Sequence, residues 1–364
     1  MNIKTENLII GSGIFGLSIA SYLLNLGQKV CIIDKYQNPN EASSNALGRV
    51  DPILGGAGHG HETKPIEVAK KSLKAYKKFI NLDNNVKEFI DLEIRPTIHF
   101  CEDESQFNSI NNVISEIDPE RNFFSIENLS TINNDISCLN NDFYNAKSIF
   151  NGTIFLDSKK YKNYLEEDSR KKGLSIIHDE ILGINNLSNN PILLSDNNTY
   201  SFKRLIIATG PWANELIGKF ENIDIYPSKG QIVKLKDPNN KFTDLHLHGP
   251  CSLIKKRDGL IWIAATVEDK GFDKTITTSA TSELMNKASK MYNGIEQFPF
   301  HSQTACLRPS VDNDLPIIKK LNNKVYLASG GGGWGGGRPS QMQEIMAQLD
   351  MTTEQQNKMR GVYP

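Results

Sequence analysis

The sequence lacks the features that indicate a crosslinked scaffold, a nucleic-acid binder or a metal protein. Its five cysteines include no CxxC pair, and an odd number argues against a disulfide framework. We therefore expect free thiols and a cytoplasmic setting. Lys plus Arg total 41 and Asp plus Glu total 42, so the net charge of −1 disfavours binding of nucleic acid through a broad basic face. No metal is predicted, although the pairs His59/His61 and His246/His248 would each face one side of a strand.

The uncharged run at residues 8–26 has the length of a membrane span but not its internal pattern. Glycines interrupt it, and neither a strongly basic flank nor a small-residue cleavage site accompanies it. The hydrophobic spacing predicts a strand over 3–10, a helix over 14–26 and a second buried strand over 29–34. Together these segments form a predicted βαβ unit.

Three glycines at Gly-x-Gly-x-x-Gly spacing follow the first predicted strand. Gly11 permits a tight turn, Gly13 lets the backbone approach a pyrophosphate, and Gly16 lets the helix pack closely on the strand. Asp34 lies eighteen residues beyond Gly16, at the end of the second strand, where an acid can bind ribose hydroxyls. The pattern predicts a dinucleotide at the positive N-terminus of the helix. It is compatible with NAD as well as FAD.

Two later strands also end in glycine. The strand at the start of Leu205–Leu216 (LIIATGPWANEL) ends in a turn at Thr209 and Gly210, where we expect the chain to pass close to the same nucleotide. The strand at Lys324–Ser329 runs into Gly330–Gly337, which holds seven of the 27 glycines. A glycine-rich run is typical of a flexible linker, but its position after an apolar strand favours a loop whose backbone approaches a planar ring.

The motifs, taken in order, resemble the D-amino-acid oxidase-like flavoproteins, which include glycine oxidase, sarcosine oxidase and D-amino-acid dehydrogenases. The resemblance is carried by GSGIFG with IIDK, ASSNALG at Ala42–Gly48, GTIFLD, LIIATGPW, YPSKGQIV, ATVEDKGFD and LRPSVDNDLPII. The last two segments are most similar to the glycine oxidase branch. The resemblance is loose over residues 85–150 and after Gly333.

The resemblance implies an α/β fold: a Rossmann-like FAD-binding domain of the glutathione-reductase type, with an inserted α+β substrate domain built on an antiparallel sheet. The FAD-binding domain would comprise residues 1–84, 146–217 and 302–364, and the substrate domain residues 85–145 and 218–301. The FAD contacts expected by position are Gly11, Gly13, Ile14, Phe15, Gly16, Asp34, Lys35, Ser43, Ser44, Asn45, Ile181, Thr209, Gly210, Trp212, Cys306, Gly331, Gly332, Gly333, Trp334 and Gly335.

Arg308 stands in the LRP motif, where the family carries an arginine that binds the substrate carboxylate. A guanidinium grips a carboxylate through two parallel hydrogen bonds. The alternative is a surface arginine paired with Asp312 or Asp314. Cys306 stands where the sarcosine oxidase branch carries the cysteine bonded to the flavin, and where the glycine oxidase branch carries a small residue. The sequence leaves two alternatives for Cys306: a thioether bond to FAD, or an ordinary buried thiol.

Three positions depart from the family pattern and leave the substrate open. Ser252 stands where glycine oxidases place a tyrosine over the substrate, and Gly333 where they place a second carboxylate-binding arginine. Trp262 lies near the lysine that sarcosine-type oxidases use in oxygen activation. Arg49 follows the stretch expected to pass near the ring, and is either a replacement polar contact or a solvated loop residue. The candidate catalytic residues are Arg308, Trp262 and Arg49.

The resemblance implies an FAD-dependent oxidoreductase that acts on a small amine or amino acid. The substrate would lose hydride from its α-carbon to flavin N5, and the imine would then hydrolyse. One alternative is a flavin-binding subunit or partner-dependent dehydrogenase component with little activity alone. Another is an NAD-linked dehydrogenase. A homo-oligomer is compatible with all three, and the expected partners include no nucleic acid.

Overall fold

The chain divides into two compact units, and each is assembled from separated stretches of sequence. Unit 1 comprises Met1–Ser44, Lys159–Ser228 and Leu307–Pro364, and unit 2 comprises Asn45–Ser158 and Lys229–Cys306. The chain therefore leaves unit 1 for unit 2 twice and returns twice. The computed structural model describes residues 2–36, 41–54, 66–128, 137–140, 147–186, 191–196, 198–218, 223–311 and 316–331.

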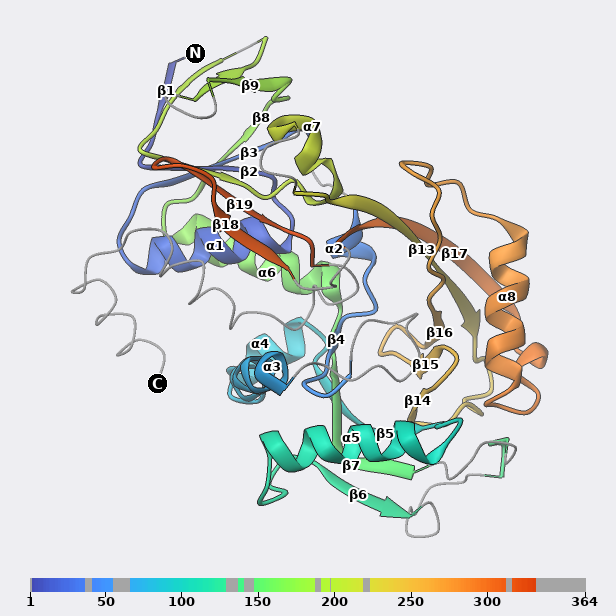
Figure 1. The fold of residues 1–364 in the computed structure, drawn as a ribbon. Helices are drawn as coiled ribbons and strands as arrows, with labels where there is room; N and C mark the ends of the chain where they lie inside the picture. Colours follow the sequence, from blue (N-terminus) through green and yellow to red (C-terminus); the bar gives the residue numbers. More distant parts are fainter. Residues whose placement is uncertain are drawn as a thin grey trace. The chain divides into compact units, whose positions relative to one another are not determined.

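Unit 1 is built on a six-stranded sheet with the strand order β18-β19-β12-β2-β3-β8 (Figure 1). Only β18 pairs antiparallel among these strands, and the other neighbours are parallel. The strand order reverses at β2, which lies between β3 and β12, and open α/β sheets bind ligands beyond the carboxyl end of such a strand. The strands are β2 Asn7–Ile10, β3 Val30–Asp34, β8 Ser175–His178, β12 Arg204–Ile207, β18 Ile317–Lys320 and β19 Val325–Ser329.

Both faces of this sheet are buried, as its nearly continuous apolar strands predict. Alternate residues of one strand enter different clusters: Ile9 packs with α1 (Ile14–Asn25) and Leu165 of α6, whereas Leu8 and Ile10 pack with α7. Figure 1 shows α1 and α6 on the same face. The remaining elements are α6 Ser158–Lys171, η2 Gly210–Trp212, α7 Ala213–Ile217, the parallel pair β1 Asn2–Lys4 and β11 Thr199–Ser201, and the antiparallel pair β9 Gly183–Asn185 and β10 Ile192–Leu194.

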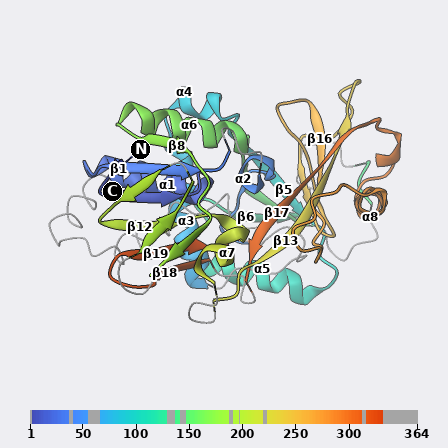
Figure 2. The ribbon, with the colours of Figure 1, turned by 90° about the horizontal axis from the view of Figure 1, so that it is seen from above.

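Unit 2 is built on a nine-stranded sheet with the order β17-β13-β16-β15-β14-β5-β7-β4, and β6 pairs with β7. Figure 2 shows β13 and β17 side by side. β14 runs parallel to β5, whereas β15 and β16 run antiparallel to each other. The strands are β4 Arg49–Val50, β5 Glu93–His99, β6 Ser125–Asn128, β7 Lys147–Phe155, β13 Tyr226–Lys236, β14 His246–His248, β15 Ser252–Lys255, β16 Leu260–Ala264 and β17 Phe300–Ser310.

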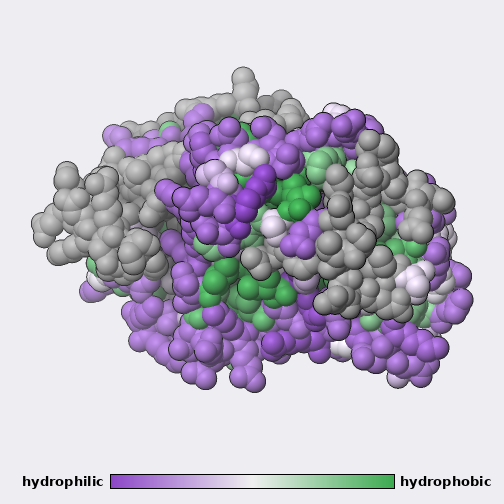
Figure 3. Space-filling model, turned by 90° about the horizontal axis from the view of Figure 1, so that it is seen from below, coloured by the Kyte–Doolittle hydropathy of each residue, from purple (hydrophilic) through white to green (hydrophobic). Residues whose placement is uncertain are grey.

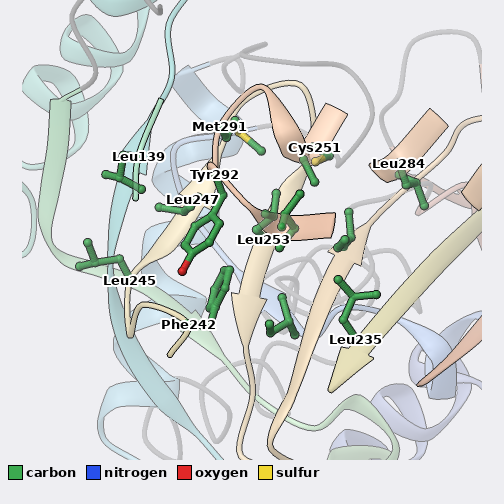
Figure 4. Packing of buried hydrophobic residues seen from close by; sticks show 14 of the residues in the cluster. Leu139, Leu235, Phe242, Leu245, Leu247, Cys251, Leu253, Leu284, Met291 and Tyr292 are labelled. Carbon is green, nitrogen blue, oxygen red and sulfur yellow. The ribbon is translucent and has the colours of Figure 1, made fainter. Parts of the chain in front are cut away.

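One face of the unit 2 sheet is apolar. Leu247 of β14 and Leu253 of β15 pack with Leu284 of α8, and the rings of Phe242 and Tyr292 stack beside them at 4.7 Å between centroids (Figure 4). Because side chains alternate along a strand, the residues on either side of Leu247 face away from this cluster. The helices of unit 2 are α3 Ile66–Ile80, α4 Asn84–Phe89, α5 Glu104–Ile117, α8 Thr278–Ser289 and η4 Ile295–Gln297. Helix α2 (Ala42–Asn45) lies at the boundary, with all but Asn45 in unit 1.

The bounds of the units differ from those that the sequence predicts. Residues 45–84 join unit 2 because β4 pairs with β7, and because α3 packs against α5. Residues 146–158 join it as well, since most of them form β7, which also pairs with β5 and β6. The stretch where the family resemblance is loose, residues 85–150, contains the 14-residue helix α5. Local spacing gives no sign of these pairings, since the partner strands are far apart in the sequence.

No helix in the described part of the chain is long and apolar enough to span a membrane. The uncharged run at residues 8–26 instead divides between β2 and α1, as its glycines predict. No group of three or more His, Cys, Asp or Glu side chains among the described residues is arranged to hold a metal, and His59 and His61 lie outside them. The face in Figure 3 is mainly hydrophilic over its described residues, with hydrophobic side chains gathered near its middle.

Candidate active site

The three motif glycines of unit 1 meet different steric demands. Gly11 has φ +105°, and a Cβ there would lie 2.4 Å from the Ala208 carbonyl oxygen, so this turn needs glycine. A Cβ on Gly16 would lie 1.9 Å from the Gly11 carbonyl oxygen, which confirms the close packing of α1 on the turn. A Cβ on Gly13 would meet only Ser43 Oγ, at 3.4 Å. The described chain therefore leaves open space beside Gly13, at the start of α1.

The first turn of α1 is suited to bind an anion. Gly13 is the N-cap and offers no side chain, and the first turn contains no acidic residue. Ser43 of α2 accepts a hydrogen bond from Ile14 N at 3.0 Å, which places the predicted ASSN segment beside this turn. The unneutralised positive end of the helix dipole and its N–H groups attract phosphate.

Asp34, at the end of β3, contacts the glycine turn directly. Its Oδ2 accepts hydrogen bonds from both Ser12 N, at 2.6 Å, and Ser12 Oγ, at 2.7 Å. Tyr36 N donates to Oδ1 at 3.0 Å. Asp34 thus stands where the sequence predicts a ribose-binding acid, and it also fixes the turn. Its neighbour Lys35 pairs with Glu180 at 2.6 Å on an exposed edge.

The carboxyl end of β12 presents a buried hydroxyl group. Thr209 Oγ1 is shielded from solvent and has no hydrogen-bond partner within the described ranges. Ser329 Oγ, at the end of β19, donates to the Gly210 carbonyl oxygen at 2.9 Å and so joins the two strand ends. A buried hydroxyl without a partner costs free energy. A polar atom of a bound ligand would satisfy it.

Most of the other residues expected at the cofactor lie in unit 1 or outside the described residues. Phe15 is in the first turn of α1, Trp212 ends η2, and Ile181 packs against the apolar cluster of β3 and β12. Ser44 and Asn45 complete α2, and Asn45 is the first residue of unit 2. Gly331 is buried just after β19. Those outside the described residues are Gly332, Gly333, Trp334 and Gly335.

These observations fit a dinucleotide. Three features lie at the carboxyl ends of β2 and β12, where the strand order reverses: the open position at Gly13, the start of α1 with no side chain on its N-cap residue, and the unsatisfied Thr209 hydroxyl. The pyrophosphate would lie against Gly13 and Ile14, and the ribose beside Asp34.

Arg308 and Cys306 both lie on β17, two residues apart, so their side chains leave the same face of that strand. Cys306 is buried and forms no disulfide. Arg308 is partly buried. Asp312 and Asp314, its alternative partners, lie outside the described residues.

Trp262, on β16 of unit 2, is held between charged side chains. Its indole Nε1 donates to Asp258 Oδ2 at 2.9 Å. The Nζ atoms of Lys234 and Lys256 lie 3.6 and 4.5 Å from the ring centroid. A cation over an indole ring is attracted by the electrons of the ring. Trp262, which stands near the position of a lysine in sarcosine-type oxidases, therefore has two lysines beside it.

Lys256 joins two of the family motifs. Its buried Nζ donates to the carbonyl oxygens of Leu47, at 3.0 Å, and Leu156, at 2.7 Å. Leu47 belongs to the ASSNALG stretch and Leu156 to GTIFLD. Burial lowers the pKa of Lys256 to about 8.

Arg49 lies in β4 and reaches the polar face of the unit 2 sheet. Its Nη1 lies 3.1 Å from His248 Nδ1, and Ser252 Oγ lies 2.8 Å from the same nitrogen. Burial lowers the pKa of Arg49, and the nearby charge of Asp51 partly opposes this. The structure thus gathers Arg49 with Ser252, the residue that departs from the family tyrosine.

Comparison with known proteins identifies the family. Residues 7–336 match the family described as FAD dependent oxidoreductase. The chain belongs to this family. It is 23% identical over 352 residues to a glycine oxidase of Bacillus licheniformis, covering 91% of the chain and 88% of that protein. Hydrogen cyanide synthase subunit HcnC of Pseudomonas aeruginosa is 32% identical over 118 residues, 32% of the chain and 28% of that protein. The crystal structure of glycine oxidase from Geobacillus kaustophilus has a TM-score of 0.81 at 18% identity and covers 96% of each chain.

The protein is therefore an FAD-dependent oxidoreductase, and the predictions of FAD and of the fold class are confirmed. NAD as the cofactor is not supported. The sequence does not predict the contacts of Ser12 and Lys256, nor the contact between His248 and Arg49. Ser12 lies within the glycine motif, at a position where the motif allows any residue. For His248, the only local indication is the H-x-H pair.

Proposed function

We propose that this oxidoreductase oxidises the C–N bond of a small amine or amino acid, with Arg308 holding the substrate carboxylate. The observation that carries the proposal is the dinucleotide turn of unit 1, with Asp34 in place, in a chain related over most of its length to a glycine oxidase. When bound, FAD supplies the hydride acceptor. The α-carbon of the uncharged amine loses a hydride, which leaves a protonated imine. Water adds to it and releases the carbonyl compound and the protonated amine or ammonium.

The chain's own residues would bind and orient the substrate. A guanidinium at Arg308 can form two parallel hydrogen bonds to a carboxylate and so fix the direction of the α-C–H bond. No side-chain base is needed if the amine binds uncharged. Trp262 remains a proposed active-site residue whose indole N–H is already bonded to Asp258.

Anaerobic reduction of the flavin tests this proposal. The protein with FAD bound should lose its visible absorbance when mixed with a small amine or amino acid that is a substrate. Replacement of Arg308 by Gln should raise KM for a carboxylate substrate by about tenfold or more. Absence of reduction across a broad panel of amines and amino acids would reject the proposed activity.

A second candidate is a subunit that needs a partner. It is favoured by the relative named hydrogen cyanide synthase subunit HcnC. Co-purification of a second chain, together with no turnover by the protein alone, would support it. None of the five cysteines forms a disulfide, which suits a reducing compartment, and on that ground we propose the cytoplasm.

A further inference from the structure

Lys162 is a charged residue on the buried side of α6, in unit 1. It is 4% exposed, whereas Lys159, one turn earlier on the same helix, is exposed. Lys162 shares its side of the helix with Leu165 and Ser169, the other two buried residues of α6. Leu165 packs in the cluster that joins α6 to α1 and to Ile9 of β2. Lysine is rarely buried to this extent unless its charge is paired.

The position of Lys162 on α6 directs its side chain toward the carboxyl edge of the sheet. Only residues 172–174 separate α6 from β8, so the helix ends near the start of β8 and begins near the opposite edge (Figure 1). β8 runs parallel to β3, with His178 beside Asp34. Lys162 lies in the first half of α6, and side chains on a helix lean toward its N-terminus. The ammonium group therefore extends toward the edge at which Asp34 and the glycine turn lie.

The electrostatic surroundings of Lys162 agree with this direction. Burial lowers the pKa of its ammonium group. The negative charges of Glu166 and Asp34 oppose this shift, whereas the positive charge of Lys159 adds to it. Lys162 and Asp34 are thus close enough for their charges to interact.

Both carboxylates near Lys162 are engaged by other groups. Glu166 Oε1 accepts a hydrogen bond from Arg170 Nε at 3.0 Å, and Asp34 already accepts three hydrogen bonds. The ammonium group of Lys162 forms no hydrogen bond or ion pair with the residues that the structure describes. A charge removed from water without a partner is unfavourable. A bound anion would supply the missing partner.

The glycine turn offers no cation of its own to a pyrophosphate. Residues 11–16 (GSGIFG) contain no basic side chain, so the turn contributes only N–H groups and the helix dipole. Lys35, which follows Asp34, pairs with Glu180 at 2.6 Å on an exposed edge. Each phosphate group of a dinucleotide carries a negative charge, and Lys162 is the buried cation on this side of the sheet that can meet it.

We propose that Lys162 binds the pyrophosphate of FAD, at the phosphate group that carries the adenosine. The ribose lies beside Asp34 and the pyrophosphate against Ile14, and this phosphate group joins the two. An ammonium group that has already left bulk water loses little on binding, and it gains a charge-assisted hydrogen bond. This role of Lys162 does not depend on which amine or amino acid is oxidised.

Replacement of Lys162 by Met tests the proposal, because Met has a similar length and no charge. The FAD affinity of the apoprotein should fall at least about tenfold. The apoprotein should unfold at the wild-type temperature or above it, since exchange of a buried charge for an apolar side chain of similar size is often neutral or stabilising. K159M, on the exposed side of the same helix, is the matched control and should change neither quantity.

Two results would overturn the proposal. FAD affinity that is unchanged in K162M would show that the cofactor does not contact the ammonium group. A lower unfolding temperature of the K162M apoprotein would show that Lys162 serves the folded chain itself. K162R keeps the charge and should keep most of the affinity that K162M loses; equal losses in both variants would also contradict a role for the charge.

Phosphorus NMR of the bound cofactor tests which phosphate group is involved. With FAD at saturation, the resonance of the adenosine-side phosphate should differ between wild type and K162M by more than that of the flavin-side phosphate. No change in either resonance, or a larger change on the flavin side, would contradict the assignment.

The pKa of Lys162 in the wild-type protein supplies a further readout. It can be followed through the Cε resonance of carbon-labelled lysine, assigned by its absence from K162R. The pKa should rise when FAD binds, because a phosphate beside the ammonium group stabilises its charged form. A pKa that stays the same or falls on FAD binding would overturn the proposal.

Discussion

Both polar hydrogens of Ser12 point to a single oxygen of Asp34, the amide at 2.6 Å and the hydroxyl at 2.7 Å. The carboxylate at the end of β3 therefore holds the glycine turn between β2 and α1. An acid in this position serves two purposes, because the three hydrogen bonds from Ser12 and Tyr36 leave one lone pair on Oδ1 that a ribose hydroxyl can use. The turn is held in shape by this contact independently of any nucleotide.

Replacement of Asp34 by Asn should weaken FAD binding by about tenfold to a hundredfold, since a hydrogen bond to a charged group contributes about 1.5–3 kcal/mol. S12A removes only the hydroxyl bond and should weaken binding less than D34N. The measurement is a fluorescence titration of the apoprotein with FAD. Equal affinity of D34N and wild type would show that the carboxylate serves neither the ribose nor the turn.

The substitutions G13A and G16A should have different effects: G16A should lower the stability of the apoprotein, and G13A should lower its affinity for FAD. In G16A the new methyl group would overlap the Gly11 carbonyl, 1.9 Å away, and should lower the stability of the apoprotein by about 2 kcal/mol or more. In G13A the methyl group meets only Ser43 Oγ at 3.4 Å, so the apoprotein should unfold at the wild-type temperature. FAD affinity should nevertheless fall at least about tenfold, because the methyl group occupies the approach of the pyrophosphate. Thermal unfolding of the apoproteins and FAD titration separate the two effects.

A G13A protein that binds FAD as tightly as wild type would contradict the assignment of Gly13 to the pyrophosphate. A G16A protein with unchanged stability would instead show that α1 can shift away from the turn.

The cofactor side of the site could be predicted from the sequence because its determinants are local. Gly11, Gly16 and Asp34 lie within one βαβ unit, and their spacing carries the geometry. The polar face of unit 2 could not be predicted in this way. Arg49 and His248 are 199 positions apart, and Lys256 and Leu47 are 209 apart. Such contacts depend on strand pairing across the sheet, which periodicity does not specify. For the same reason, the pairing of β4 with β7 could not be predicted, and residues 45–84 belong to unit 2 rather than to the predicted FAD-binding domain.

We expect FAD to be bound without a covalent link to Cys306. The thiol is buried on β17 and forms no disulfide, and a buried cysteine commonly behaves as a small hydrophobic residue. After acid precipitation the yellow colour should remain in the supernatant, and the intact mass of the denatured chain should be 40.7 kDa without added flavin. Flavin that stays with the denatured chain, and is lost in C306A, would establish the thioether instead.

Lys256 should make the protein more stable as the pH rises above about 8. Its pKa in the folded protein is lowered from 10.5 to about 8 by burial, whereas the unfolded chain keeps the ordinary value. Between these two values the unfolded state binds more protons than the native state, so the free energy of unfolding rises with pH. The shift corresponds to about 3 kcal/mol over the whole interval. The neutral amine keeps two N–H groups for the carbonyl oxygens of Leu47 and Leu156.

This contribution can be isolated by comparing the wild-type protein with K256M, which keeps the length of the side chain but cannot titrate. The difference in free energy of unfolding, measured with urea at pH 7.5, 9 and 10.5, should grow in favour of the wild type by about 3 kcal/mol. Lys236, an exposed lysine at the end of β13, is the matched surface control, and K236M should leave the wild-type profile unchanged. A constant difference between wild type and K256M across this range would show that the Lys256 amine is as well solvated in the native protein as in the unfolded chain, which its contacts with two buried carbonyl groups argue against.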